Sequence, residues 1–100
     1  MYILLPMDSD EVQEASLTKL EDVKIWAQML IEEGQLVEVN HSSDKDSFEN
    51  LSECVVVVND NEYVWPFMEK NMMVLVAHTQ RSIDDIVEAY LFKELHDLAY

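Results

Sequence analysis

Glycine, proline, cysteine and basic residues are all scarce in this chain of 100 residues. It contains one glycine, two prolines, one cysteine and six lysines or arginines. With a hydrophobic content of 49%, this composition excludes a disordered chain and predicts a folded one. The single cysteine, Cys54, excludes an internal disulfide. The length suits one compact domain over residues 1–100.

The shortage of basic residues also limits the partners that the chain can bind. Its 21 acidic residues give a net charge of -15, which repels nucleic acid phosphates and anionic lipid headgroups. We therefore expect a protein partner, no nucleic acid and no membrane. The first apolar run, residues 2–7, is too short for a membrane span. Together with the single cysteine, this predicts a cytoplasmic protein, for which the charge also serves solubility.

Two apolar runs in the second half predict buried strands. Residues 54–58 end at Asn59-Asp60-Asn61-Glu62, and residues 72–77 end at His78-Thr79-Gln80-Arg81. Strands that are apolar on both faces belong inside a sheet covered by helices. Their polar ends mark where an open α/β sheet usually builds its site.

The remaining pattern predicts three more strands and three helices. Residues 2–7 form the first strand, and residues 24–32 and 35–40 form a hairpin about Glu33-Gly34. Residues 12–23 carry at most one helical turn, and residues 41–47 form a loop. Short helices are expected over 48–53 and 63–70, and a long helix with an apolar face reaching Leu98 follows the S-x-x-D box at 82–85.

This order, β-β-β-α-β-α-β-α, predicts an α/β fold with three layers. Its mixed five-stranded sheet combines the antiparallel hairpin with parallel strands, and helices lie on its faces. Right-handed crossovers put the first, fourth and fifth strands side by side. That layout is the one of a ribonuclease H-like sheet.

The hairpin segment 29–39 and the helix sequence Val87-Glu88-Ala89-Tyr90-Leu91 carry a family resemblance. With the Val-rich strand between them, they make nearly the whole chain resemble the dinitrogenase iron-molybdenum cofactor biosynthesis family. The resemblance implies a ribonuclease H-like fold. It also implies a non-catalytic carrier, chaperone or accessory protein for iron-sulfur or iron-molybdenum clusters.

The sequence departs from both motifs of that family. The family's His-Phe-Gly-Arg-Ala segment is replaced by Lys19-Leu20-Glu21-Asp22-Val23, and its glycine-rich turn by residues 59–62. Glycines let backbone N–H groups approach an anion, whereas these acids repel it. The resemblance implies a cofactor site at the polar strand ends, with binding weakened or lost. Its residues would be Asp8, Asn59, Asp60, Asn61, His78 and Arg81.

A protein-interaction or regulatory module is the alternative function. Tyr63 and Trp65 follow the polar end of the fourth strand, and aromatic side chains are enriched in interface cores. Such a module would dock a basic partner against its acidic surface. The same residues are also consistent with packing in the core.

Catalysis is not expected. Asp8, Glu49, Asp60 and Asp84 fall where a ribonuclease H-like nuclease holds two metal ions, yet the basic face that a nuclease needs is missing. The alternative is that these carboxylates are solvated.

The possible metal donors do not follow a ligand spacing either. They are His41, His78, His96, Cys54 and Asp60. Two interpretations remain: His78 and Asp60 form a weak metal site, or the histidines are ordinary surface or hydrogen-bonded residues. Cys54 is expected to be a buried thiol rather than a nucleophile. Arg81 would hold an anion or, as we favour, pair with a surface Asp.

Overall fold

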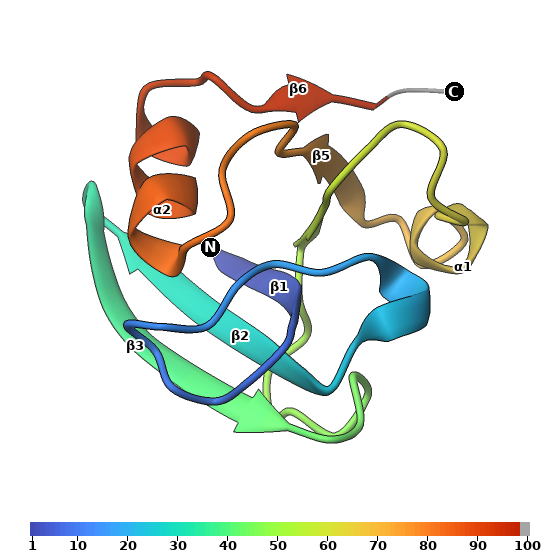
Figure 1. The fold of residues 1–100 in the computed structure, drawn as a ribbon, viewed down its shortest axis with the longest axis horizontal. Coiled ribbons are helices and arrows are strands. Elements are labelled where there is room, and N and C mark those ends of the chain that lie inside the picture. Colours follow the sequence, from blue (N-terminus) through green and yellow to red (C-terminus); the bar gives the residue numbers. More distant parts are fainter. Residues whose placement is uncertain (99–100) are drawn as a thin grey trace.

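The computed structural model describes residues 1–98, which fold around a mixed six-stranded sheet (Figure 1). The strand order is β3-β2-β1-β4-β5-β6. The strands are β1 (Tyr2–Met7), β2 (Ile25–Glu32), β3 (Gln35–Ser42), β4 (Cys54–Val57), β5 (Met73–Val76) and β6 (His96–Asp97).

The centre of the sheet is parallel, as the two apolar runs predict. β1 pairs with β4 and β4 with β5, with Ile3 opposite Cys54 and Val56 opposite Leu75. The placement of these three strands side by side is therefore confirmed. β2 and β3 form the predicted antiparallel hairpin, and its turn residues Glu33 and Gly34 have φ angles of 53° and 78°. Glycine accepts this left-handed conformation without strain.

The prediction of five strands is wrong, because the chain leaves its last helix early. α2 (Ile83–Leu91) is followed by Lys93 at a φ of 59°, and the N–H of Glu94 bonds the carbonyl of Ala89 at 2.8 Å. A left-handed residue of this kind ends a helix and reverses the chain. His96 is thereby brought beside Val76, and β6 extends the sheet antiparallel to β5.

The predicted helix over residues 48–53 is also wrong. This segment is an irregular loop, and the side chain of Gln28 on β2 bonds the carbonyl of Asn50 and the hydroxyl of Ser52, each at 2.8 Å. The other helical predictions hold in shorter form. η1 (Leu20–Asp22) supplies the single turn expected within 12–23, and α1 (Trp65–Met68) lies within 63–70.

Apolar side chains cover both faces of the sheet. On one face Ile83 and Ile86 of α2 pack with Ile3 and Leu5 of β1. On the other face Phe67 of α1 packs with the side chains that point the opposite way from β1, β4 and β5, which include Leu4, Val55, Val57, Val74 and Val76. Within residues 1–98 no helix is long and apolar enough to cross a bilayer.

Candidate functional site

The carboxyl ends of β4 and β5 bring Asp60 and His78 together, as their positions after neighbouring parallel strands predict. Nε2 of His78 lies 2.5 Å from Oδ1 of Asp60, and both side chains are about half exposed. The ring of His96, on β6, has its centroid 6.0 Å from that of His78. The pair is a surface contact whose charge depends on protonation of the imidazole.

Among residues 1–98, Arg81 does not form the predicted pair with a surface Asp. Its guanidinium donates to the carbonyls of Ala77 and Gln80 at 2.8 Å and of His78 at 3.2 Å. These bonds hold the loop between β5 and α2, and the carbonyl of Arg81 accepts from the N–H of Leu17 at 2.7 Å. Arg81 therefore stabilises this loop, because three of its hydrogen bonds go to backbone carbonyls rather than to an external anion.

Asp8, Asn59 and Asn61 are also occupied by local contacts. Oδ1 of Asp8 accepts from the N–H of Ser16 at 2.8 Å, which closes the loop that follows β1. Oδ1 of Asn59 accepts from the N–H of Asn61 at 2.8 Å. This Asx turn shapes the segment after β4. The predicted site thus divides into the Asp60–His78 pair and residues that hold their own loops.

Glu62 is the residue at this end of the sheet that the sequence-based site omits. Its Oε2 accepts from the backbone N–H of Leu20 at 2.7 Å, across 42 residues of sequence. The bond joins η1 to the turn after β4. Around it lies a hollow of about 250 Å³, lined by Leu20, Glu21, Asn61, Glu62 and Tyr63. The sequence marks Glu62 as acidic but gives no sign of its partner.

The four carboxylates considered for a nuclease do not form a metal centre. Asp84 lies in the first turn of α2, and Glu49 lies in the loop that precedes β4. Within residues 1–98 no three His, Cys, Asp or Glu side chains are grouped to hold a metal ion. Cys54 is fully buried at the start of β4. Burial, with smaller effects from Asp97 and Glu53, raises the pKa of its thiol from 9.0 to about 12, so it is a protonated core group.

Tyr63 and Trp65 are more exposed than core packing requires. Tyr63 is 72% exposed and Trp65 is 51% exposed, whereas Val64 and Phe67 beside them are buried. The segment therefore packs Val64 and Phe67 into the core and presents the other two aromatic rings at the surface.

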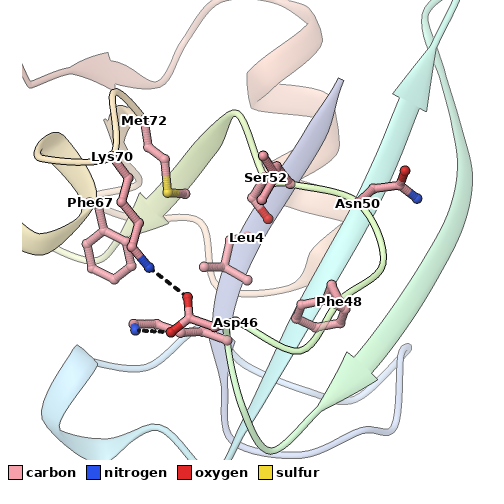
Figure 2. Close-up of a pocket in the computed structure, with 10 residues that line it drawn as sticks. Leu4, Asp46, Phe48, Asn50, Ser52, Phe67, Lys70 and Met72 are labelled. Carbon is pink, nitrogen blue, oxygen red and sulfur yellow. Dashed lines mark hydrogen bonds and ion pairs between the residues drawn. The ribbon is translucent and has the colours of Figure 1, made fainter.

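A larger pocket, of about 400 Å³, lies at a place where the sequence analysis predicts no site. Figure 2 shows it between the loop before β4 and the segment after α1, with Leu4 of β1 at its floor. Its residues come from three separate stretches of the chain, which is why no motif marks it. One signal was available: Lys45 and Lys70 at this pocket are two of only six basic residues.

Comparison with known proteins identifies the fold but not a family. No protein-family model matches the sequence, and no characterised protein matches it either. Among solved structures, the protein PH0822 aligns with a TM-score of 0.75 at 15% identity, covering 100% of this chain and 96% of its own. A protein of Methanocaldococcus jannaschii named as a proposed dinitrogenase aligns with a TM-score of 0.77 at 16% identity, covering 99% and 95%. The chain therefore shares its whole fold with these two proteins.

Proposed function

We propose that this chain is a non-catalytic accessory protein related to the dinitrogenase iron-molybdenum cofactor biosynthesis family, and that its own side chains have replaced the cluster. The full-length likeness to a proposed dinitrogenase supports the relation. So does the arrangement of an antiparallel hairpin beside three parallel strands, on which we base assignment to the ribonuclease H-like folds. The hydrogen bond from Leu20 to Glu62 is the observation that carries the loss of the cluster.

The residues at the carboxyl ends of the strands do not fit an anionic metal cluster. The backbone N–H of Leu20 already bonds a carboxylate, and Glu21 lies beside the same hollow. An anionic cluster placed there would be repelled by the carboxylates of Glu21 and Glu62, and this repulsion is stronger where water is partly excluded. Thiolate, the usual ligand of iron-sulfur clusters, is missing as well, because Cys54 is buried in the core.

Anaerobic titration tests this proposal. The protein is incubated with an iron-sulfur cluster or with the iron-molybdenum cofactor, separated from unbound cluster and examined by visible absorption and Trp fluorescence. We expect no chromophore in the protein fraction and no change in emission. A stoichiometric chromophore that survives the separation would show that the chain carries the cluster and would overturn the proposed loss.

The absence of catalysis is part of the same proposal. Its support is the dispersal of Asp8, Glu49 and Asp84, which belong to three separate segments. Incubation with Mg²⁺ or Mn²⁺ and single- or double-stranded nucleic acids is expected to leave the substrates intact. Cleavage that is lost on replacing Asp60 would contradict it.

Docking of a basic protein is the second candidate function, and the exposure of Tyr63 and Trp65 favours it. Glu21 and Glu62 line the adjoining hollow, so the aromatic pair would form the centre of an interface and the acids its polar rim. Immobilised wild-type protein should retain a basic partner that salt releases. The Tyr63→Ala/Trp65→Ala variant should lose it, whereas Phe92→Ala, which removes an exposed aromatic ring elsewhere, should keep it.

A further inference from the structure

The pocket of about 400 Å³ lies at the opposite end of the parallel strands from the residues discussed above. Residues 48–52 lead directly into β4, and residues 70–72 lead directly into β5. Its volume falls within the range of about 300–1,000 Å³ that is usual for small-molecule sites. Leu4, Phe48 and Phe67 form much of its apolar lining, and Lys45, Asp46 and Lys70 are among its polar residues.

The interior of this pocket is apolar and is built on the core. Leu4 and Phe67 belong to the buried cluster on this face of the sheet, and Phe48 packs against that cluster. Figure 2 shows the rings of Phe48 and Phe67 on opposite sides of Leu4. Two facing aromatic side chains over an aliphatic floor suit a flat apolar body, because aromatic rings pair in offset or tilted arrangements.

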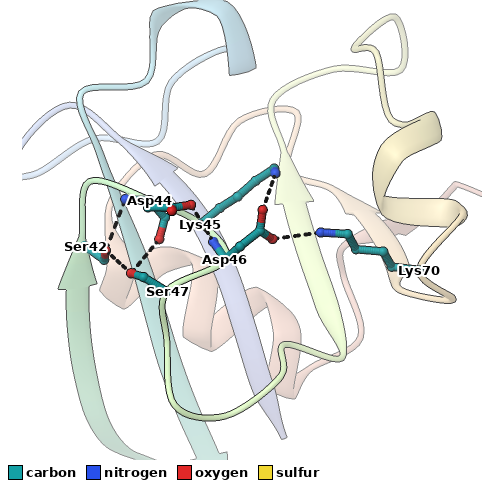
Figure 3. Close-up of polar contacts among 6 residues, drawn as sticks. All are labelled: Ser42, Asp44, Lys45, Asp46, Ser47 and Lys70. Atoms are coloured by element: carbon teal, nitrogen blue, oxygen red, sulfur yellow. Dashed lines mark hydrogen bonds and ion pairs between the residues drawn. The ribbon is translucent and has the colours of Figure 1, made fainter.

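The wall formed by residues 43–52 is held by hydrogen bonds from Gln28 of β2 and by hydrogen bonds within its own turn. Gln28, which is 2% exposed, donates from Nε2 to the carbonyl of Asn50 and to Oγ of Ser52. Figure 3 shows the turn at its start, where Asp44 accepts from the N–H of Asp46 at 2.9 Å and the hydroxyls of Ser42 and Ser47 contact each other. The wall is therefore preorganised without help from the lysines.

Asp46 links the two walls of the pocket. Its Oδ1 lies 2.7 Å from Nζ of Lys70, and its Oδ2 lies 3.1 Å from Nζ of Lys45 (Figure 3). The hydrogen bond with Lys70, followed by the one with Lys45, lowers the pKa of the Asp46 carboxyl. One carboxylate thus occupies the position between two ammonium groups, in a protein with a net charge of -15.

Stability alone is a weak reason for this arrangement. All three side chains are substantially exposed, and surface ion pairs contribute about 0–1 kcal/mol to folding. Asp46 also lies on the turn at 55% exposure, so its side chain has room to turn toward solvent. A ligand carboxylate brought to the same position would gain the two lysines as partners.

We propose that this pocket binds a small aromatic monocarboxylate. The ring system lies over Leu4 between Phe48 and Phe67, and the ligand's carboxylate takes the place of Asp46 between the two lysines. Ser52, which also lines the pocket, offers its hydroxyl as a polar contact to the ligand. This inference does not rest on the proposed function, because it concerns the other end of the strands and needs no cluster.

The test compares 2-naphthoate with its neutral counterpart 2-naphthamide, by titration calorimetry at low ionic strength and by amide chemical shifts. Wild-type protein should bind the carboxylate about two- to fivefold more tightly than the amide, since exposed ion pairs of this kind contribute up to about 1 kcal/mol. The shifts should fall within residues 45–52 and 67–72. Added salt should weaken the binding of 2-naphthoate only.

Three variants make the test specific. Lys45→Gln/Lys70→Gln should reduce the affinity for 2-naphthoate about two- to fivefold and leave that for 2-naphthamide unchanged. Lys24→Gln/Lys93→Gln makes the same change in charge away from the pocket and should alter neither affinity. Asp46→Asn should strengthen binding of 2-naphthoate severalfold, because the internal competitor loses its charge.

Several outcomes would overturn the proposal. These are equal affinities for acid and amide, weaker binding by Asp46→Asn, shifts outside the pocket, or no binding of 2-naphthoate up to its solubility limit. Folding of each variant is checked by its unfolding midpoint, so that a loss of structure is not mistaken for a loss of site.

Discussion

The two ends of the parallel strands differ in how their polar groups are used. At the carboxyl end Arg81, Asp8 and Glu62 all bond backbone groups of the chain itself. At the amino end Gln28 bonds the carbonyl of Asn50, and the side chains of Lys45, Asp46 and Lys70, which line the 400 Å³ pocket, bond one another. The polar groups at the carboxyl end are thus occupied by hydrogen bonds to the backbone, whereas the ion pairs of Asp46 at the amino end can be replaced by those of a ligand.

The contrast shows that the strand order alone does not determine whether the residues at the strand ends can bind a ligand. An open α/β sheet directs ligands to the carboxyl ends of its strands, and the fold retains that geometry here. At that end, however, Asp8 and Glu62 accept from the chain's own N–H groups and Arg81 donates to its carbonyls, so these side chains bond the chain itself rather than an anion. A site predicted from strand order has therefore to be checked against the partners that each polar atom already has.

Replacing one aromatic residue from each end gives the largest expected difference. Phe67→Ala should lower the free energy of unfolding by about 3–5 kcal/mol, because the ring is buried and lies 6.2 Å from the ring of Trp26. Tyr63→Ala should change it by less than about 0.5 kcal/mol, because that ring is mostly exposed. Urea denaturation followed by circular dichroism measures both. Equal losses would show that the Phe67 side of the pocket is not part of the core.

Removing the anchor of the pocket wall should have the next largest effect. Gln28→Leu leaves the carbonyl of Asn50 without its donor, which should cost about 1–3 kcal/mol. Amide hydrogen exchange should also become faster within residues 43–53. Gln13→Leu, at an exposed position, is the matched control and should leave both quantities unchanged. Unaltered exchange in Gln28→Leu would mean that the wall is held by other contacts.

Opening the carboxyl end should have a smaller effect. Glu62→Ala removes the acceptor of the Leu20 N–H, and we expect a loss of about 1 kcal/mol because water can reach this half-buried position. Glu69→Ala removes an exposed carboxylate on the same segment and should cost less than about 0.5 kcal/mol. Thermal or chemical unfolding compares them. If the two variants lost the same stability, the hydrogen bond of Glu62 with Leu20 would not be stabilising this end of the sheet.

The Asp60–His78 contact should give the smallest effect. Asp60→Asn keeps a hydrogen-bonding side chain and removes a charge that is half exposed, so the stability should change by less than about 0.5 kcal/mol. A double-mutant cycle with His78→Gln measures the coupling directly. A coupling above about 1 kcal/mol would show that this pair, rather than Glu62, secures the carboxyl end.

Local pattern was sufficient for the parallel centre and the hairpin, because both are written in continuous apolar or alternating runs. It failed at residues 48–53, where apolar spacing suggests a helix and a side chain from β2 supplies the hydrogen bonds instead. It failed again at β6, since a strand of two residues has no period to detect and Lys93 occupies a left-handed position where glycine is the usual signal.

The candidate site was predictable only in part, for the same reason. Asp60 and His78 follow neighbouring parallel strands, so their meeting is a consequence of strand order. The bond from Leu20 to Glu62 and the pocket over Leu4 depend on how loops fold back over the sheet. No spacing within a loop encodes such contacts, because each joins segments far apart in the chain.

The pairing of β1 with β4 also determines the order in which the chain can fold. β2 and β3 are joined by a two-residue turn, so their hairpin needs only local contacts. β1 and β4 come from opposite halves of the chain. Closing the loop between them lowers the entropy of the chain before the burial of either strand compensates for it. We therefore expect formation of the parallel centre, on which both ends of the sheet depend, to be the slow step of folding, so that the pocket forms only after the two halves of the chain have paired.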